Sequence, residues 1–197
     1  VQTCALPIYG IEYRVNEGDG AFYGPKIDFH ILDALKRSWQ CATIQLDFQM
    51  PEKFDLTYIG EDNKKYRPVV IHRAVYGSID RFVGILIEHY SGAFPLWLAP
   101  VQVKLLPVSD QYLDYALQVK SSLSQAGIRV EIDSRNEKLG YKIREAQLEK
   151  VPYMLILGEN EQSNGTVAVR KRGEGDIGTM KMEPFIGQIA IEIREKK

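Results

Sequence analysis

The 197-residue sequence has few cysteines, no long apolar run and almost no net charge. Its two cysteines are Cys4 and Cys41. Because Cys4 lies in a segment that we exclude below, Cys41 has no intrachain disulfide partner, which is compatible with a reducing cytoplasm. No apolar run approaches the roughly 20 residues of a transmembrane helix, so we expect no association with a membrane. A net charge of −1 excludes a general attraction to nucleic acid, and any RNA contact must come from a local patch.

What the sequence does contain is an ordinary globular composition, 45% hydrophobic and 26% charged. Its length suits one large or two small domains. In the first half, residues 26–32 alternate apolar and polar side chains, and residues 38–48 and 68–75 are also typical of strands. Residues 78–90 have apolar side chains at helical spacing. Strands with hairpin-length connections and one long helix predict an antiparallel sheet.

The pattern changes near Pro100, after which strands and helices alternate. We expect helices from about residue 110 to 126, from 139 to just before Pro152, and from 183 to 195. Strands are expected at residues 101–106, 128–132, 153–158 and 166–170. This order predicts an α/β unit. The sequence therefore predicts an α+β region followed by an α/β domain.

Residues 71–86, IHRAVYGSIDRFVGIL, carry the most specific pattern in the chain. A strand ends after His72, turns through Gly77 and enters a helix. Ser78 suits the N-cap and Asp80 suits the positive end of the helix dipole. Arg81 does not, because a cation in the first turn of a helix is unfavourable by roughly 0.3–1 kcal/mol. An anionic ligand at the helix start would account for Arg81, and the alternative is a solvated surface arginine.

This stretch resembles motif 3 of class II aminoacyl-tRNA synthetases. Residues 23–29 (YGPKIDF), 39–48 (WQCATIQLDF) and 97–103 (WLAPVQV) are similar to bacterial-type threonyl-tRNA synthetases. The similarity is collinear from about Ile11 to the C-terminus. It implies that residues 9–99 are the C-terminal part of a class II catalytic domain, with part of its antiparallel sheet. Residues 100–197 are then an α/β anticodon-binding domain.

The first eight residues, VQTCALPI, are similar to the in-frame translation of a sequencing-library adaptor. The alternative is a short natural segment with one apolar strand. There is no basic region followed by a long apolar core, so they are not a signal peptide. We interpret residues 1–8 as an artefactual start of a truncated gene fragment and exclude them from functional reasoning.

The resemblance implies roles for several residues of the first half. Arg81 and Gln40 are the implied catalytic residues, and both would bind ATP, which such enzymes use with Mg²⁺. The remaining implied contacts are Thr43 and Ser78 with ATP, and Tyr23, Lys26 and Gln45 with the amino acid and adenylate. Adenylation is catalysed mainly by positioning and by charge neutralisation.

His72 is the candidate metal ligand. A lone histidine that ends an apolar strand is usually a hydrogen-bonded core group, and zinc needs several ligands. The resemblance implies that His72 is one of three zinc ligands and that the other two precede Ile11. Zinc that binds the amino and hydroxyl groups of threonine would reject valine. An apolar pocket alone discriminates between these two amino acids by only about 10²-fold. Cys41 does not match the ligand cysteine and is expected to be a core thiol.

The second half contains a charged region around residues 134–144 and again at Arg170. Taken by itself this is a solvated charged face, and we place Lys142 on it. The resemblance makes the region an anticodon reader, because single-stranded bases are recognised by hydrogen bonds to their edges. The implied anticodon-binding residues are Asn136, Arg144, Glu161 and Arg170.

The leading hypothesis is ATP-dependent ligation of threonine to its cognate tRNA through a threonyl-adenylate, in the cytoplasm. The implied partners are ATP, threonine and tRNA(Thr), and the parent enzyme is expected to be a homodimer. The fragment itself is expected to be inactive alone. Two alternatives stay open: another synthetase of the same subclass, such as prolyl, and a non-catalytic synthetase-like RNA-binding or accessory module.

Overall fold

The computed structural model describes residue 10 and residues 12–196. Contacts divide the chain into two compact units, Val1–His89 and Tyr90–Lys197. Residues 1–8, which we interpreted as adaptor-derived, lie outside the described residues, and that interpretation stays a prediction. Among the described residues, no helix is long and apolar enough to cross a membrane.

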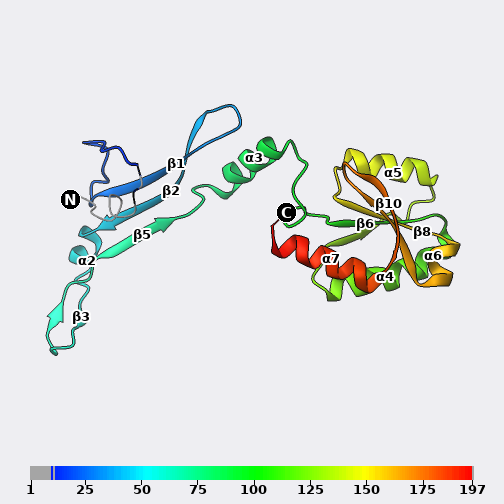
Figure 1. Cartoon of the computed structure of the whole chain (residues 1–197). Coiled ribbons are helices and arrows are strands. Elements are labelled where there is room, and N and C mark those ends of the chain that lie inside the picture. The colour runs from blue at the N-terminus through cyan, green and yellow to red at the C-terminus, as the bar shows by residue number, and fades with distance from the viewer. Residues whose placement is uncertain (1–9, 11, 197) are drawn as a thin grey trace. The chain divides into compact units, whose positions relative to one another are not determined.

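The first unit contains a three-stranded antiparallel sheet in the order β1-β2-β5 (Figure 1). Its strands are β1 (Lys26–Leu32), β2 (Ser38–Asp47) and β5 (Val70–Ala74). The expected antiparallel sheet is therefore confirmed, with strand bounds within two residues of those predicted. The long helix is confirmed as α3 (Ile79–Tyr90).

Three short elements between β2 and β5 were not predicted. Helix α2 (Gln49–Lys53) follows β2 directly. Strands β3 (Tyr58–Ile59) and β4 (Lys65–Tyr66) then form a separate hairpin. They are too short to show a periodic pattern in the sequence.

The pairing of β1 with β2 is interrupted by a bulge. Phe29 pairs with Ala42, but the next residue, His30, pairs with Gln40. Cys41 is thus the extra residue on β2. A bulge of this kind changes which side chains of the strand share a face. This irregularity decides the arrangement of the candidate site.

The second unit contains a five-stranded sheet in the order β10-β9-β8-β6-β7. Strand β6 pairs in parallel with β7 and β8, whereas β9 and β10 are antiparallel additions. The strands are β6 (Val103–Pro107), β7 (Val130–Ile132), β8 (Tyr153–Leu157), β9 (Thr166–Lys171) and β10 (Gly175–Lys181). The predicted α/β unit is confirmed, but β10 was missed. It contains two glycines with positive φ, which obscure a strand pattern.

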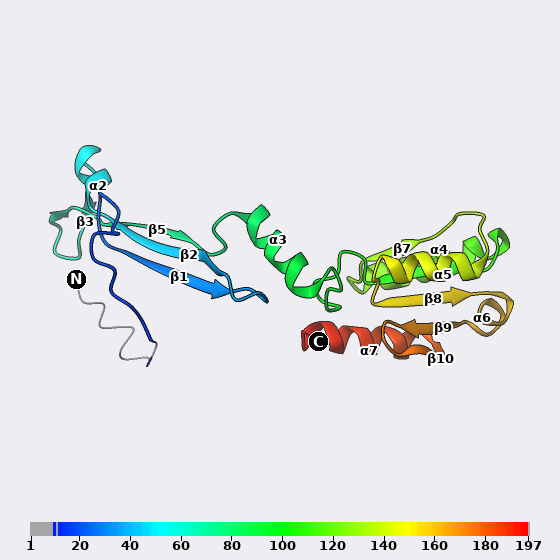
Figure 2. The ribbon, with the colours of Figure 1, turned by 90° about the horizontal axis from the view of Figure 1, so that it is seen from above.

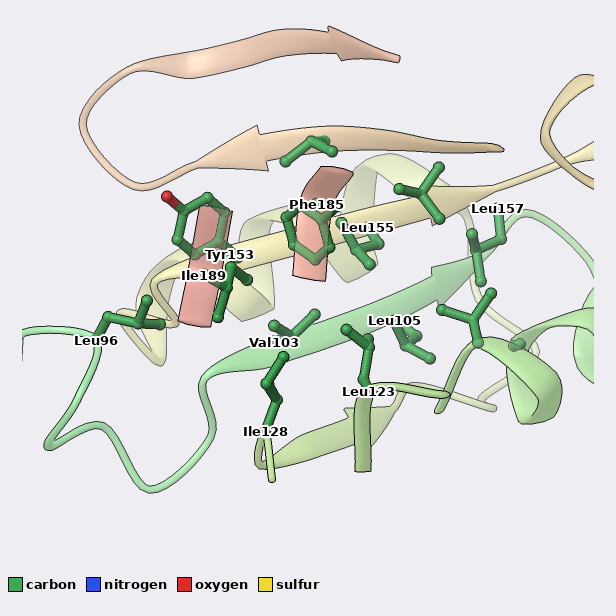
Figure 3. Close-up of a cluster of buried hydrophobic side chains, with 14 residues drawn as sticks. Leu96, Val103, Leu105, Leu123, Ile128, Tyr153, Leu155, Leu157, Phe185 and Ile189 are labelled. Atoms are coloured by element: carbon green, nitrogen blue, oxygen red, sulfur yellow. The ribbon is translucent and has the colours of Figure 1, made fainter. Parts of the chain in front are cut away.

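Helices cover both faces of this sheet (Figures 1 and 2). Helices α4 (Leu113–Gln125) and α7 (Met182–Arg194) pack on one face, and α5 (Leu139–Leu148) packs on the other. A short 3₁₀ turn (Asp110–Tyr112) precedes α4, and α6 (Glu159–Asn164) follows β8. The main core lies under α4 and α7 and contains fourteen buried side chains, including Tyr153 and Phe185 in edge-to-face contact (Figure 3).

Side-chain hydrogen bonds connect the segment between α3 and β6 to the rest of the second unit. Its carbonyl groups accept hydrogen bonds from a buried glutamine and two arginines, namely Gln102 to Leu96, Arg129 to Trp97 and Ala99, and Arg172 to Ala93 and Phe94. Burial lowers the pKa of the Arg172 guanidinium. Residues 93–99 are therefore part of the second unit rather than a free linker.

Candidate functional site

A carboxylate that we did not predict organises the first unit's site. Asp28 Oδ1 accepts hydrogen bonds from Gln40 Nε2 and Thr43 Oγ1, each at 2.7 Å. Its Oδ2 lies 2.9 Å from Lys26 Nζ. Three side chains implied in ATP or substrate binding therefore converge on one aspartate. Partial burial raises the pKa of Asp28, but hydrogen bonds from Thr43 and Lys26 outweigh it and hold the pKa below its ordinary value.

The bulge brings Gln40 to this position. In a regular strand Gln40 and Thr43 would point to opposite faces, because they are an odd number of residues apart. The extra residue at Cys41 changes the alternation, and both amide and hydroxyl reach the same oxygen of Asp28. Cys41 itself is buried, as expected of a core thiol.

The same face continues across β2 to β5. Lys26 pairs with Gln45, and Gln45 pairs in turn with His72. Tyr23, just before β1, donates its hydroxyl proton to Gln45 Oε1, and its ring packs edge-on against the His72 ring at 5.6 Å. The structure thus brings the implied substrate residues together beside the implied metal ligand.

His72 has a buried carboxylate as its partner. Its Nε2 lies 2.8 Å from Oδ2 of Asp47, the last residue of β2. Metal-ligating histidines almost always donate their second ring N–H to such a group. His72 therefore fits the role of a zinc ligand. Within the described part of the chain, no group of three or more His, Cys, Asp or Glu side chains could hold a metal ion.

The turn into α3 lies against the bulge. Gly77 has φ of 67°, and a Cβ atom there would approach the Cys41 carbonyl oxygen to 2.9 Å. Only glycine allows this approach without a shift of the backbone. Ser78 Oγ faces the backbone N–H of Arg81 at 3.5 Å, which is a weak N-cap contact. Arg81 is exposed in the first turn, as the sequence indicated.

The second unit does not gather the four implied anticodon residues at one place. Asn136 follows β7 and Glu161 lies in α6 after β8, so both stand beyond the carboxyl ends of parallel strands. Arg170 is on the antiparallel strand β9 and pairs with Met154 near the start of β8. Arg144 is exposed on α5. These residues would therefore have to contact different parts of an extended anticodon loop.

Arg170 lines a cavity of about 110 Å³ together with Gln147, Val151 and Met154. Its Nη1 lies 3.5 Å from Oδ2 of Asp176. Its Nε is buried and has no hydrogen-bond partner among the described residues. A buried donor without an acceptor is unfavourable.

Glu161 has a structural contact as well. Its Oε2 accepts the backbone N–H of Gly158 at 2.9 Å and so caps the start of α6. A carboxylate at this helix start is also favourable on electrostatic grounds alone.

The placement of Lys142 on a solvated face was wrong. Lys142 is 2% exposed, and its Nζ donates to the carbonyl groups of Pro107 and Asp133, each at 3.1 Å. It connects the ends of β6 and β7 to α5. Asp133 also binds the Arg135 guanidinium through both carboxylate oxygens, at 2.8 and 2.6 Å. These contacts fix the start of the loop that carries Asn136.

Comparisons with known proteins agree with this division of the chain. The family model described as tRNA synthetase class II core domain (G, H, P, S and T) matches residues 2–90. The model described as anticodon binding domain matches residues 102–191. The match to the class II core domain includes residues 2–8. It therefore disagrees with our interpretation of residues 1–8 as adaptor-derived.

Individual relatives identify the kind of synthetase. The threonine–tRNA ligase of Acetivibrio thermocellus is 63% identical over 193 residues, and that of Syntrophomonas wolfei is 66% identical over 192 residues. Each match covers 98% of this chain. The chain belongs to the threonyl-tRNA synthetase family. It spans about 30% of the length of these ligases.

A solved threonyl-tRNA synthetase structure supports the same assignment. The crystal structure of the RNA binding domain of threonyl-tRNA synthetase from Cryptosporidium parvum Iowa II is 40% identical, with a TM-score of 0.82. The match covers 95% of this chain and 48% of that one. The predicted resemblance to threonyl-tRNA synthetases, and the α+β fold class, are therefore confirmed.

Proposed function

We propose that this chain supplies one side of an ATP- and threonine-binding site, together with an anticodon-reading domain. The reaction is the ATP-dependent attachment of threonine to tRNA(Thr) through a threonyl-adenylate, in the cytoplasm and in a parent enzyme that is a homodimer. The observation that carries the proposal is the shared sheet face. It presents Lys26, Gln40 and Thr43 around Asp28, next to Tyr23, Gln45 and His72.

The ATP side of the site is assigned to Gln40, Thr43, Ser78 and Arg81. Gln40 and Thr43 offer an amide and a hydroxyl for hydrogen bonds, and Arg81 offers a guanidinium at the positive end of α3. Phosphate groups are stabilised at such a helix start, and an arginine adds charge-assisted hydrogen bonds. Mg²⁺ accompanies ATP in this proposal and neutralises part of its charge.

The threonine side is assigned to Tyr23, Lys26, Gln45 and His72. The hydrogen bond of Tyr23 to Gln45 holds both side chains in place, and Asp28 orients the Lys26 ammonium. His72 would hold zinc together with ligands outside the described residues. Zinc, when bound, supplies coordination to the hydroxyl group by which threonine differs from valine.

The anticodon part of the proposal rests on Asn136, Arg144, Glu161 and Arg170. Asn136 is exposed in a loop whose start is fixed by Asp133. The Arg170 side chain is 27% exposed on β9. Arginine suits the acceptor edge of guanine, and asparagine can both donate and accept.

The test is a chimaera in which this chain replaces the matching segment of the Acetivibrio thermocellus ligase, at 63% identity. The chimaera should charge tRNA(Thr) with threonine, and Arg81→Ala should reduce kcat/KM by at least tenfold, as for a lost charge-assisted contact worth about 1.4 kcal/mol or more. A folded chimaera that binds tRNA but does not activate threonine would refute the catalytic proposal. That result would favour the non-catalytic RNA-binding module instead.

A further inference from the structure

Asp47 and His72 are neighbours across two strands of the first unit. Asp47 pairs with Val70, and Gln45 pairs with His72, so the two side chains lie diagonally on one face. The distance from His72 Nε2 to Asp47 Oδ2 is 2.8 Å. The Asp47 side chain is 2% exposed, whereas that of His72 is 45% exposed. The carboxylate is therefore the fixed member of the pair.

Two backbone groups hold the Asp47 carboxylate from the other side. Its Oδ1 accepts the N–H groups of Gln49 and Met50 at 3.0 and 2.9 Å, at the start of α2. Two backbone N–H donors favour the ionised form of a carboxylate, and the ordinary pKa of an aspartate, about 3.9, lies far below the neutral range. Asp47 thus stays ionised and has no proton to donate.

An ionised carboxylate can only accept a hydrogen bond, so the proton between Asp47 and His72 must belong to the imidazole. We propose that Asp47 is a positioning residue that holds the proton of neutral His72 on Nε2, which leaves the lone pair of Nδ1 available to a metal ion. Neutral imidazole has one donor and one acceptor nitrogen, and the partner of the one determines the state of the other.

The surroundings of the ring agree with this assignment. No described residue forms a hydrogen bond with His72 Nδ1, and the Tyr23 ring limits rotation of the imidazole by its edge-on contact at 5.6 Å. The metal part of the inference rests on the proposed function, whereas the position of the proton does not.

The experiment is long-range ¹H–¹⁵N NMR of the imidazoles in this chain, without metal, well above the ordinary histidine pKa of about 6.5. The sequence contains three histidines, so His72 can be assigned with a single His72→Gln variant. Protonated and unprotonated ring nitrogens differ widely in ¹⁵N shift. We expect the protonated signal at Nε2 of His72.

The variant Asp47→Asn should reverse this state. The N–H groups of Gln49 and Met50 need an oxygen, so the amide nitrogen of the new side chain faces His72 and donates to Nε2. The proton of the imidazole then moves to Nδ1. Asp62→Asn, in the β3–β4 hairpin, is the matched control and should leave His72 unchanged.

A wild-type spectrum with the proton on Nδ1, or with both tautomers equally populated, would overturn the inference. A folded Asp47→Asn chain with an unchanged His72 would do so too. The signals of His30 and His89 show whether the variant is folded, and the wild-type spectrum decides the matter if it is not. Because no zinc is used, failure of this inference is distinguishable from failure of the proposed function, which the chimaera tests.

Discussion

Gln40 and Thr43 donate hydrogen bonds to the same oxygen of Asp28, although regular alternation would place them on opposite faces of β2. The bulge at Cys41 shifts the alternation of β2, so that both side chains lie on the same face. The turn at Gly77 packs on that bulge and brings the start of α3 beside it. A local irregularity of one strand thus connects the sheet residues to the helix that carries Arg81.

Asp28 should be required for catalysis although it need not contact ATP or threonine. In the chimaera, we expect Asp28→Asn to lower kcat/KM for ATP about tenfold or more, because the Lys26 ammonium loses its ionised partner and Gln40 loses a charged acceptor. A hydrogen bond to a charged group is worth roughly 1.5–3 kcal/mol, and 1.4 kcal/mol is tenfold. Asp62→Asn is the control, and equal kinetics of the two variants would contradict the role of Asp28.

The sequence predicted the three strands of this unit from alternation and the long helix from apolar spacing. It did not predict the bulge, since nothing in the run around Cys41 distinguishes a regular strand from an irregular one. Asp28 was overlooked for the same reason: its partners are known only once the register is known. Lys26 and Asp28 are two residues apart on β1 and therefore share a face of the strand. This spacing was the one signal in the sequence that could have pointed to Asp28.

Lys142→Met should destabilise the second unit by about 1–3 kcal/mol, because the carbonyl groups of Pro107 and Asp133 lose their donor. The loop at residues 134–138 should also exchange its amide hydrogens faster. Urea unfolding and hydrogen exchange measure the two effects. If Lys142→Met unfolds at the same urea concentration as the wild type, the buried ammonium contributes nothing to stability.

In the second unit, sequence patterns predicted the alternation of strands and helices but not which charged side chains are buried. Lys142 lies within a charged run, and its partners are carbonyl groups at the ends of two strands distant in sequence. The same holds for Arg129 and Arg172, which fasten the segment at residues 93–99. Such contacts depend on tertiary structure, whereas periodicity reports only which face is apolar.

Alkaline pH should destabilise the second unit through Tyr153. Burial raises the pKa of this phenol to about 12, and its hydrogen bond to Glu192 adds to the shift. The unfolded chain ionises near pH 10, so the stability from the neutral phenol is complete below pH 10 and is lost between about pH 10 and 12. Thermal unfolding of Tyr153→Phe should depend less on pH in that window. An identical pH dependence in both proteins would contradict this assignment.

The two units should differ in stability. Among the described residues of the first unit, the buried hydrophobic side chains are Cys41 and Ile85, whereas the second unit's main core contains fourteen. Hydrophobic burial is the dominant favourable contribution to folding. We expect amides of β1, β2 and β5 to exchange faster than those of β6 and β8. Equal protection in both sheets would show that the units unfold together.

We expect the second unit of this chain to bind threonine tRNA. The most direct measurement on the chain as it stands is its affinity for the anticodon stem-loop of tRNA(Thr), against the same stem-loop with a scrambled anticodon. We expect weak, salt-dependent binding that favours the cognate loop. Arg170→Ala should cost roughly 1–3 kcal/mol and relax discrimination at one base, whereas the exposed Lys181→Ala should have a small effect on all loops alike. Equal affinity for the cognate and scrambled loops would contradict the account.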